Sequence, residues 1–390
     1  MKKTDLGVFI VAPLLILGLD ALTNSINTTR NEWDFIYYIA MARDGFDAAN
    51  LASPFAYRFF TTGLVNLLFG LGLSIESGFR LTACLGAFLQ LTGIFFFVRW
   101  LTQSTRGAWI ALFVTAFSLF NIKFLLFDIY RPDHFVYALI LLQTYIAFER
   151  KFIPLLILTL IGSTMREFTL IPLFAYLFML AWEDRTTAAR QGLVSALFIL
   201  PAIILPRLLI PVTEDFQIIG FAPEKLLNAA VLPFIPSFPV NFIFSILAYF
   251  LPLFLLASPK EIKSTYRNLP QTQRNYLTAY TALVLFLSFF GGTDFNRFAS
   301  FLFLPQIILI GWLAPNISNL KFTIALICLF IFNRLWMRIP DWDVQTYRDF
   351  YGGFALQLNA NTAGRFLELL VFITGGYLLN RKARNEAQIA

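Results

Sequence analysis

Residues 79–101 read Phe-Arg-Leu-Thr-Ala-Cys-Leu-Gly-Ala-Phe-Leu-Gln-Leu-Thr-Gly-Ile-Phe-Phe-Phe-Val-Arg-Trp-Leu, a nearly unbroken apolar segment. Apolar segments of comparable length recur along the whole chain, and no polar interval is long enough for a water-soluble domain. Of the 390 residues, 58% are hydrophobic and only 14% are charged, whereas soluble domains carry about 25% charged residues. The sequence therefore predicts an all-α polytopic membrane protein, because helices satisfy their own backbone hydrogen bonds in lipid.

We predict about twelve transmembrane helices. Several of them are short for a hydrocarbon core of about 30 Å and are expected to be tilted or broken. The apolar segment 57–74 is not counted, because we expect it to re-enter and leave on the same face as part of a first outer loop with juxtamembrane helices. The predicted spans are 6–24, 79–101, 107–121, 134–149, 151–164, 168–182, 191–210, 239–257, 275–291, 298–314, 321–337 and 366–380.

The distribution of basic residues predicts the orientation of these spans. With Lys2 and Lys3 in the cytoplasm, the cytoplasmic ends and loops hold more than half of the 30 basic residues and few acids, as the positive-inside rule requires. Counting 57–74 as a full span would move the basic loop 259–274 to the outer side, so we reject that arrangement. Both termini are then cytoplasmic, and segment 6–24 is a retained signal anchor. The net charge of +7 is a topology signal and does not indicate nucleic-acid binding.

The predicted outer face carries most of the informative polar residues. The cytoplasmic loops are short and basic, like simple connectors. We expect one transmembrane domain over residues 1–390, without a soluble domain, whose working face is the outer one. Cys84 and Cys328 both fall inside predicted spans and indicate packing residues, not a disulfide framework. The longer outer loops, with acids, arginines, tyrosines and tryptophans, are 25–56, 122–133, 211–238, 292–297 and 338–365.

Asp34 lies about ten residues beyond the first predicted span, in an amphipathic part of the first outer loop. Helical spacing places Asp34, Tyr37 and Tyr38 on one side of a helix in the membrane interface, where tyrosines lie at headgroup depth. In one interpretation Asp34 only stabilises the dipole of a helix capped by Asn31, by about 0.3–1 kcal/mol. In the other, Asp34 takes part in chemistry on a lipid-borne substrate.

Two acids and a histidine follow at the outer ends of the third and fourth spans. Asp128 and Asp133 flank Arg131 around a proline that interrupts a helix, so both acids can point into one cavity. The alternative is an ordinary outer turn in which the acids pair with Arg131 and Lys123. His134 is the only histidine in the chain, so it is a poor signal for a metal site. We expect it to form a hydrogen bond at the interface.

Two turns that contain arginine complete the outer set. Arg166 and Glu167 separate two short apolar segments. Either they neutralise each other, or Arg166 faces a phosphate and Glu167 orients it or a sugar hydroxyl; we favour the second, because a simple turn needs no ions. Asp294 and Arg297 follow two glycines, and a guanidinium at the start of a span can grip phosphate oxygens in a fork. These two residues, three apart, can also simply pair with each other.

Asp341 and Asp343 form an Asp-x-Asp pair in the long outer loop 338–365. Carboxylate oxygens can hold a divalent cation, but two carboxylates without further ligands indicate a solvated loop. We therefore predict no certain cofactor and assign no metal ligand, while a divalent cation stays an option.

With these residues in view, the chain resembles the GT-C superfamily of polytopic membrane glycosyltransferases. In that superfamily the first outer loop carries the key acid on a juxtamembrane helix, matched here by Asp34 with Tyr37 or Tyr38 after it. The likeness covers roughly residues 1–310, and residues 311–390 add further spans and an outer loop. A Pro-Phe-x-Tyr-Arg segment often follows in bacterial members, matched by Pro54, Phe55, Tyr57 and Arg58. Later outer turns supply acids and arginines, matched by Asp128, Asp133, Arg166, Glu167, Asp294 and Arg297.

The resemblance implies a glycosyltransferase of the cytoplasmic membrane that works on the extracytoplasmic face. It would move a sugar from a polyprenyl-phosphate donor to an acceptor hydroxyl on a lipid or a saccharide, with Asp34 as general base and outer arginines binding the phosphate. The implied residues for donor phosphate and lipid are Tyr57, Arg58, Arg166 and Arg297. The implied substrate-binding residues are Tyr37, Tyr38, Asp128, Arg131, Asp133, His134, Glu167 and Asp294.

Three other functions stay open from the sequence. A lipid-linked saccharide polymerase or ligase would depend on Arg166, Arg297 and the loop 338–365, and less on Asp34. A transporter would place ionisable residues near mid-membrane and often shows inverted repeats, and no repeat is evident here. A non-catalytic relative would serve as a structural subunit of a membrane complex, with protein partners that the sequence does not identify.

Overall fold

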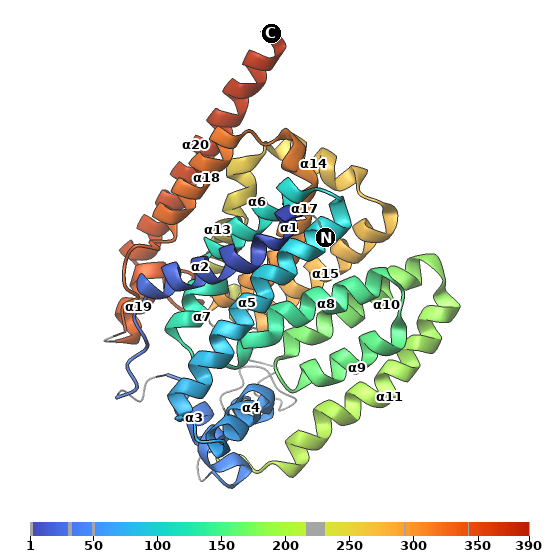
Figure 1. Ribbon diagram of the computed structural model, residues 1–390, viewed down its shortest axis with the longest axis vertical. Helices are drawn as coiled ribbons and strands as arrows, with labels where there is room; N and C mark the ends of the chain where they lie inside the picture. The colour runs from blue at the N-terminus through green and yellow to red at the C-terminus, as the bar shows by residue number, and fades with distance from the viewer. Residues whose placement is uncertain are drawn as a thin grey trace.

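The computed structural model of the chain is nearly all helical (Figure 1). It describes residues 3–29, 33–48, 51–215, 231–291, 294–341 and 343–389. The predicted class, an all-α protein with several apolar helices long enough to cross a membrane, is confirmed at that level. The GT-C fold stays a prediction.

The elements have the following bounds. The first ten helices are α1 (Lys3–Leu6), α2 (Val8–Ala21), α3 (Phe35–Asp44), α4 (Phe59–Gly70), α5 (Ile75–Thr102), α6 (Thr105–Ala116), α7 (Phe124–Phe127), α8 (Val136–Phe148), α9 (Phe152–Ser163) and α10 (Ile171–Glu183). The later helices are α11 (Arg185–Leu209), α13 (Ser237–Leu256), α14 (Pro259–Asn268), α15 (Gln271–Phe290), α16 (Phe295–Ala299), α17 (Phe303–Leu313), α18 (Asn319–Phe332), α19 (Val344–Tyr351) and α20 (Ala360–Ile389). Two short strands pair in parallel, β1 (Ala52–Ser53) and β2 (Glu214–Asp215).

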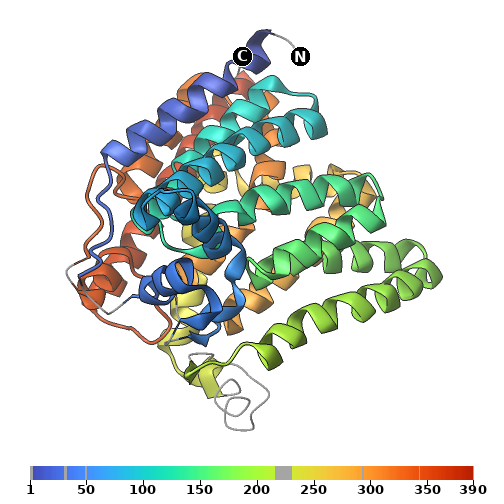
Figure 2. The same cartoon turned by 60° about the horizontal axis from the view of Figure 1, so that its bottom comes forward.

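The helices form one bundle. We call the end of the bundle that carries α3 and α4 the loop end. α8, α9 and α10 pack against one another, and α11 packs on α9 and α10 at the edge of the bundle (Figure 1). On the other side α18 and α20 pack together, and α20 also packs on α13. The short helices α3 and α4 lie together at the end of the bundle away from the C-terminal end of α20 (Figures 1 and 2).

Fewer helices than predicted are long enough to cross a membrane unaided. Five qualify in the described part of the chain: α5, α11, α13, the stretch Phe295–Asn316 and the stretch Ala360–Arg381. The predicted number of twelve spans is therefore not confirmed. The predicted spans 134–149, 151–164 and 168–182 contain α8, α9 and α10, which have 13, 12 and 13 residues. At 1.5 Å per residue each is about 18–20 Å long, short of a core of about 30 Å.

The span predicted over 107–121 is bent near its end, between Ala116 and Leu119. α6 and the following stretch Leu119–Phe127 together are apolar enough to cross, but the chain turns by 66° between them. Asn121 lies at this bend in a π-helical segment and is fully buried. Its side chain donates to the Tyr249 hydroxyl at 2.8 Å and accepts from Gln90 at 3.1 Å. A buried amide needs such partners, so the bend is held by polar contacts to α5 and α13.

Contacts between distant loops agree with the predicted division into two faces. Among segments predicted as cytoplasmic, Arg150 donates to Glu183 at 2.6 Å. Among segments predicted as outer, the Asn24 side chain donates to the Ile339 carbonyl at 2.9 Å. Each of these contacts joins loops that the sequence placed on the same face. Which of the two faces is cytoplasmic stays a prediction.

The segment 57–74 contains a helix that is too short to cross. α4 has 12 residues, and its first turns contact two turns that the sequence placed on the outer face. The Thr61 hydroxyl donates to the Pro132 carbonyl at 2.9 Å, and the Phe60 N–H donates to the Thr164 carbonyl at 3.2 Å. These contacts agree with a segment that does not reach the opposite face.

The segment 259–274 is more ordered than the simple connector that we expected. Its first part forms α14, which begins with a capping box. The Ser258 hydroxyl accepts from the Glu261 N–H at 3.3 Å, and the Glu261 carboxylate accepts from the Ser258 N–H at 2.6 Å. This reciprocal pair satisfies two N–H groups at the helix start. The Ser-x-x-Glu signal was present in the sequence and was overlooked.

Gly86 marks the closest approach between α5 and the turn that carries the predicted acids. A Cβ atom there would lie 2.0 Å from the His134 carbonyl oxygen, so the backbones would have to separate. We expect Gly86→Ala to lower the free energy of unfolding by about 1–3 kcal/mol, as overpacking does. Gly63→Ala on α4 is the matched control, because nothing lies within 4 Å of its Cβ position. It should be neutral or stabilising by about 0.5–1 kcal/mol. Thermal unfolding in detergent compares the two, and equal effects would contradict the close contact.

Candidate functional site

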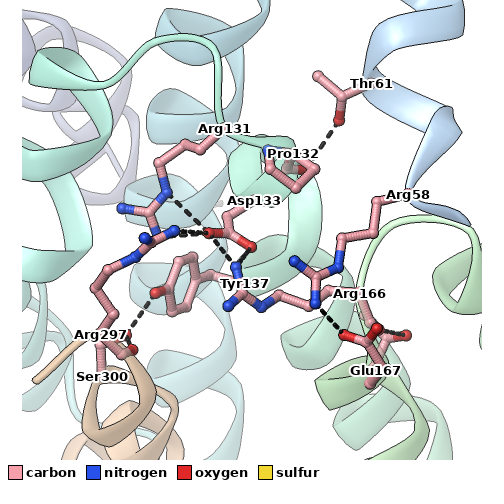
Figure 3. A network of polar contacts seen from close by, with 11 residues as sticks. Arg58, Thr61, Arg131, Pro132, Asp133, Tyr137, Arg166, Glu167, Arg297 and Ser300 are labelled. Carbon is pink, nitrogen blue, oxygen red and sulfur yellow. Dashed lines mark hydrogen bonds and ion pairs between the residues drawn. The ribbon is translucent and has the colours of Figure 1, made fainter. Parts of the chain in front are cut away.

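Asp133 lies at the centre of a buried cluster of arginines. Its side chain is fully buried and accepts hydrogen bonds from Arg131 (Nε to Oδ2, 2.8 Å) and Arg166 (Nη1 to Oδ2, 2.6 Å). Arg297 approaches the same carboxylate from another segment, with Nη2 at 3.9 Å from Oδ2. Figure 3 shows the three guanidinium groups converging on this single acid. We call Arg131, Asp133, Arg166 and Arg297 the arginine cluster.

Three separate segments deliver these side chains. Arg131 and Asp133 come from the turn before α8, in which a proline starts a short 3-10 segment. Arg166 has an extended backbone between α9 and α10. Arg297 lies on α16, whose start is capped by Asp294, because the Asp294 carboxylate accepts from the Arg297 N–H at 3.3 Å. Every member of the cluster is therefore held at the end of a helix or in a turn between helices.

Aromatic rings form the walls around the guanidinium groups. Arg131 lies 5.0 Å and Arg297 5.6 Å from the centre of the Phe124 ring. Arg166 lies 5.6 Å from the centre of the Phe298 ring. Such contacts each contribute about 0.5–2 kcal/mol, and the guanidinium groups of Arg131 and Arg166 are buried among these apolar rings. Charges in this region therefore act on one another in a medium of low dielectric constant.

The cluster holds Asp133 in its ionised form. Burial alone would raise the pKa of Asp133, but Arg166, Arg131 and Arg297 together lower it well below its usual range. One negative charge therefore faces three positive charges within the cluster. Outside the cluster, Asp34, Asp128 and Asp294 also act electrostatically on Arg297, so nearby carboxylates balance part of this positive charge.

Asp128 lies beside the cluster and differs from Asp133. Burial raises the pKa of Asp128 to about 6, although Arg297 and Arg131 oppose this shift. Its Oδ1 atom is buried and has no hydrogen-bond partner among the residues described. Asp128 is thus close to its titration point near neutral pH, which is a property common in functional sites.

Each arginine of the cluster keeps one buried N–H group without a protein partner. Within the described ranges these groups are Arg131 Nη1, Arg166 Nε and Arg297 Nε. A buried donor left unpaired costs about 1–3 kcal/mol, so an ordered water or a ligand oxygen is the expected partner. A phosphate group has several oxygen acceptors and matches the fork of a guanidinium.

Asp34 lies at the N-terminal end of α3 and is exposed. Its side chain does not cap the helix by a hydrogen bond, and Asn31 lies outside the described residues. The charge of Asp34 is close enough to act electrostatically on Arg297, Asp128 and Tyr38. The acid of the first outer loop and the arginine cluster therefore share one region of the molecule.

Arg58 and Glu167 form a second ion pair next to the cluster, 2.9 Å long (Figure 3). Burial alone would raise the pKa of Glu167, but Arg58 and Arg166 lower it. The Tyr38 hydroxyl is buried beside Arg58, and burial raises its pKa to about 12. Arg166 and Glu167, adjacent in sequence, thus turn to different ion-pair partners. The interpretation in which they neutralise each other in a simple turn is wrong.

Tyr37 and His134 make contacts away from the cluster. The Tyr37 hydroxyl donates at 3.0 Å to Glu214, the first residue of the strand β2. His134 is buried, and its Nδ1 lies 2.9 Å from the Thr82 hydroxyl on α5. His134 therefore forms a hydrogen bond, as predicted, but inside the bundle against α5; its place relative to the membrane interface stays a prediction.

Tyr57 lines a small cavity beside the second ion pair. The cavity measures about 40 Å³, and its lining includes Glu167 and Arg207. The Arg207 guanidinium lies 4.7 Å from the centre of the Tyr57 ring. This cavity is bounded by α4, α9 and α11, so it lies at the edge of the bundle.

The predicted alternatives for the other charged residues can also be compared with the structure. Asp133 pairs with Arg131, as one interpretation expected. Lys123 does not join the acids, because its ammonium donates to the carbonyls of Leu335 and Met337 at 2.6 and 2.5 Å. The Arg297 guanidinium contacts Asp133, while Asp294 caps the backbone of α16.

Several residues of the site were not predicted from the sequence. The Tyr137 hydroxyl lies 2.6 Å from the Ser300 hydroxyl, which donates to the Arg297 carbonyl at 2.5 Å. Tyr137 follows Asp133 by four residues, a spacing that places both on one helix face and was available as a signal. Ser300 and Phe124 gave no signal, because their partners lie in other segments.

The Asp-x-Asp pair of the long outer loop has structural partners. Asp341 accepts from the Asn27 N–H at 3.1 Å. Asp343 caps α19 by accepting from the Thr346 N–H at 2.7 Å. Within the described residues, no group of three His, Cys, Asp or Glu side chains is placed to hold a metal ion.

Comparisons of the chain with protein-family profiles, with curated proteins and with solved structures find no match.

Asp133→Asn tests whether the cluster depends on its acid. The substitution leaves buried guanidinium groups without their shared carboxylate, and breaking a buried pair in this way costs about 3–5 kcal/mol. Glu183→Gln breaks the more exposed pair with Arg150 and should cost less than about 1 kcal/mol. Thermal unfolding of both variants in detergent measures the difference. A similar small loss in both would show that the cluster contributes little to stability.

Asp128 should make stability depend on pH between about 4 and 6. Because its pKa is raised from 3.8 to about 6, the folded state keeps a proton that the unfolded state releases. This stabilisation is complete below the unfolded pKa and is lost as pH rises through the folded pKa. Asp128→Asn should therefore be more stable than wild type at pH 7, by up to about 3 kcal/mol, and similar at pH 4. The free energy of unfolding of both proteins would be measured from pH 4 to pH 7. A constant difference between them across this range would contradict the raised pKa of Asp128.

Proposed function

We propose that this protein is a membrane glycosyltransferase of GT-C type. It would transfer a sugar from a polyprenyl-phosphate donor to the hydroxyl of a lipid or saccharide acceptor. The observation that carries the proposal is the position of Asp34, an exposed carboxylate within electrostatic reach of Arg297. In such a reaction the carboxylate of Asp34 would take the proton of the acceptor hydroxyl. The nearby guanidinium groups would stabilise the negative charge of the departing phosphate.

In the proposed reaction, the acceptor oxygen attacks the anomeric carbon of the donor sugar. The bond between that carbon and the phosphate oxygen breaks, and its electron pair leaves with the phosphate. The hydroxyl proton passes to Asp34, which acts as general base. The anomeric configuration is inverted when attack and departure occur on opposite sides.

Arg297 is the arginine best suited to meet the departing phosphate. Its side chain is 17% exposed, against 2% for Arg131 and 4% for Arg166. Its contact with Asp133 is also the longest of the three, at 3.9 Å. Arg131 and Arg166, which are more deeply buried, would hold Asp133 and add positive electrostatic potential at the phosphate. A preorganised donor of this kind contributes about 10²–10³ to the rate when charge develops in the transition state.

The donor lipid would approach from the edge of the bundle. Tyr57 and Arg207 line the cavity beside the Arg58–Glu167 pair, and neighbouring positions of α11 such as Leu208 are exposed and apolar. Arg58 would then contact the phosphate side of the donor, and Tyr57 the first part of the prenyl chain. In this arrangement the site opens on the extracytoplasmic face, with both termini in the cytoplasm.

A lipid-linked saccharide polymerase or ligase is the second candidate. The observation that favours it is a difference in side-chain contacts. Arg131 and Arg166 donate hydrogen bonds to Asp133, whereas the Asp34 side chain does not cap its own helix. In that case the arginines would carry the reaction and Asp34 would be dispensable.

Asp34→Asn separates the two candidates. It should lower sugar transfer by about 10²–10⁴-fold, the range for loss of a general base, while the thermal unfolding temperature stays near that of wild type. Asp47→Asn, which changes another exposed acid of the same loop, is the matched control and should keep its activity. Transfer would be followed by mass spectrometry of lipid-linked sugars, first in cells lacking the protein to identify the accumulated donor, then with each variant restored. Full activity of Asp34→Asn would overturn the proposed role.

A further inference from the structure

A polar groove lies between α18, α19 and α20, away from the arginine cluster. It measures about 440 Å³, and its polar lining includes Arg334, Asp349, Asn361, Arg365 and Glu368. α19 separates this groove from the first site. The opposite side of α19 presents the buried Tyr347 ring, which packs on Trp33 with ring centres 5.0 Å apart.

Two arginines in the groove share one carboxylate. Arg365 and Arg334 both contact Glu368, the second with Nη2 at 3.4 Å from Oε2. Arg365 is only 5% exposed and donates through Nη2 to the Phe332 carbonyl at 3.1 Å. Its Nε is a buried donor without a partner among the described residues. Both guanidinium groups therefore depend on one carboxylate, and Arg365 Nε is left as an open hydrogen-bond donor.

Asp349 is the other acid of the groove, and amide groups occupy it. Its Oδ1 accepts from Gln345 and Asn359, each at 2.9 Å, and also from Gln357. Three amide donors on one oxygen stabilise the carboxylate locally. Asp349 therefore does not take the place of Glu368 as an ion-pair partner of the two arginines.

The surface next to the groove is apolar. Arg365 lies five residues beyond the start of α20, which corresponds to a depth of about 7–8 Å along the helix. Further along α20, Leu367, Leu370 and Val371 are 64%, 44% and 63% exposed. A charged groove directly above an exposed apolar helix face matches the division of a lipid into headgroup and chain.

We propose that this groove binds the phosphate group of a membrane lipid, with Arg365 and Arg334 on the phosphate and the lipid chains along α20. This site rests on the membrane placement of the chain but not on the proposed transferase activity. Two kinds of lipid share the required chemistry, a phospholipid and a polyprenyl phosphate. In both, the phosphate oxygens would accept from the free Arg365 N–H and compete with Glu368 for the guanidinium groups.

Native mass spectrometry of the purified full-length protein in detergent tests this proposal. The probes are phosphatidylglycerol, phosphatidylethanolamine, a polyprenyl phosphate and, as the lipid without phosphate, diacylglycerol. Arg365→Gln should weaken binding of the phosphate-bearing lipids by about tenfold, the loss of one charge-assisted contact. Arg338→Gln is the matched control and should bind like wild type. Arg338 is an exposed arginine in the segment between α18 and α19.

Glu368→Gln gives an effect of opposite sign and covers the case in which Arg365→Gln does not fold. It removes the competing carboxylate and leaves both arginines, so it should tighten lipid binding several-fold. Stronger binding of the phospholipids would identify a structural lipid, and stronger binding of the polyprenyl phosphate would identify a carrier lipid; either supports the site. Asp34→Asn should leave this binding unchanged, which separates the result from the proposed activity. Equal binding of diacylglycerol, or no change in folded Arg365→Gln and Glu368→Gln, would overturn the proposal.

Discussion

The carboxylate of Asp133 is the group on which the loop end of this bundle depends. It is fully buried, and it accepts hydrogen bonds from Arg131 and Arg166 while Arg297 lies 3.9 Å away. These side chains come from the turn before α8, the turn before α10 and the start of α16. A charge inside an apolar bundle is expensive unless it is paired, so the ends of these helices cannot separate without exposing an unpaired charge. One ionic contact thereby fixes the relative position of segments that are far apart in the sequence.

Breaks in the helices make this polar centre possible. A continuous helix would satisfy its own backbone and leave little room for charged side chains to meet between neighbours. Here the bend after α6, held by Asn121 with Gln90 and Tyr249, redirects the chain toward the turn that carries Asp128 and Asp133. The same turn packs directly on α5 at Gly86, where no side chain intervenes. The turns of the cluster also bound three short helices, because α9 ends just before Arg166, and α8 and α10 begin just after Asp133 and Arg166.

The arginine cluster and the groove between α18, α19 and α20 share one type of contact and differ in their surroundings. In each, guanidinium groups outnumber the carboxylate that they contact, and a buried N–H group is left for a further acceptor. The arginine cluster has the exposed Asp34 within electrostatic reach, whereas the groove beside α20 lies next to an exposed apolar helix face. This difference underlies the two proposals, sugar transfer at the cluster and lipid binding at the groove. α19 lies between them, with Tyr347 toward one side and Asp349 toward the other.

The sequence by itself determined the class of the protein and the residue types at the site. Apolar segments such as 79–101 and the scarcity of charge predict helices in a membrane. The length and apolar character of one segment can be read from the sequence without knowledge of its tertiary contacts. Asp34, Asp133, Arg166 and Arg297 were also singled out as candidates from the sequence, since charged residues between apolar segments are conspicuous. Only the tertiary structure decided which charges meet: Arg166 turns to Asp133 and not to its neighbour Glu167, and Glu167 turns to Arg58, 109 positions away. It also decided where the chain bends, by 66° between α6 and the stretch Leu119–Phe127, whereas the sequence predicted only that several spans are short and tilted or broken. The physical reason is that ion pairs in an apolar medium form between helices, so their partners depend on how the whole bundle packs and not on spacing along the chain.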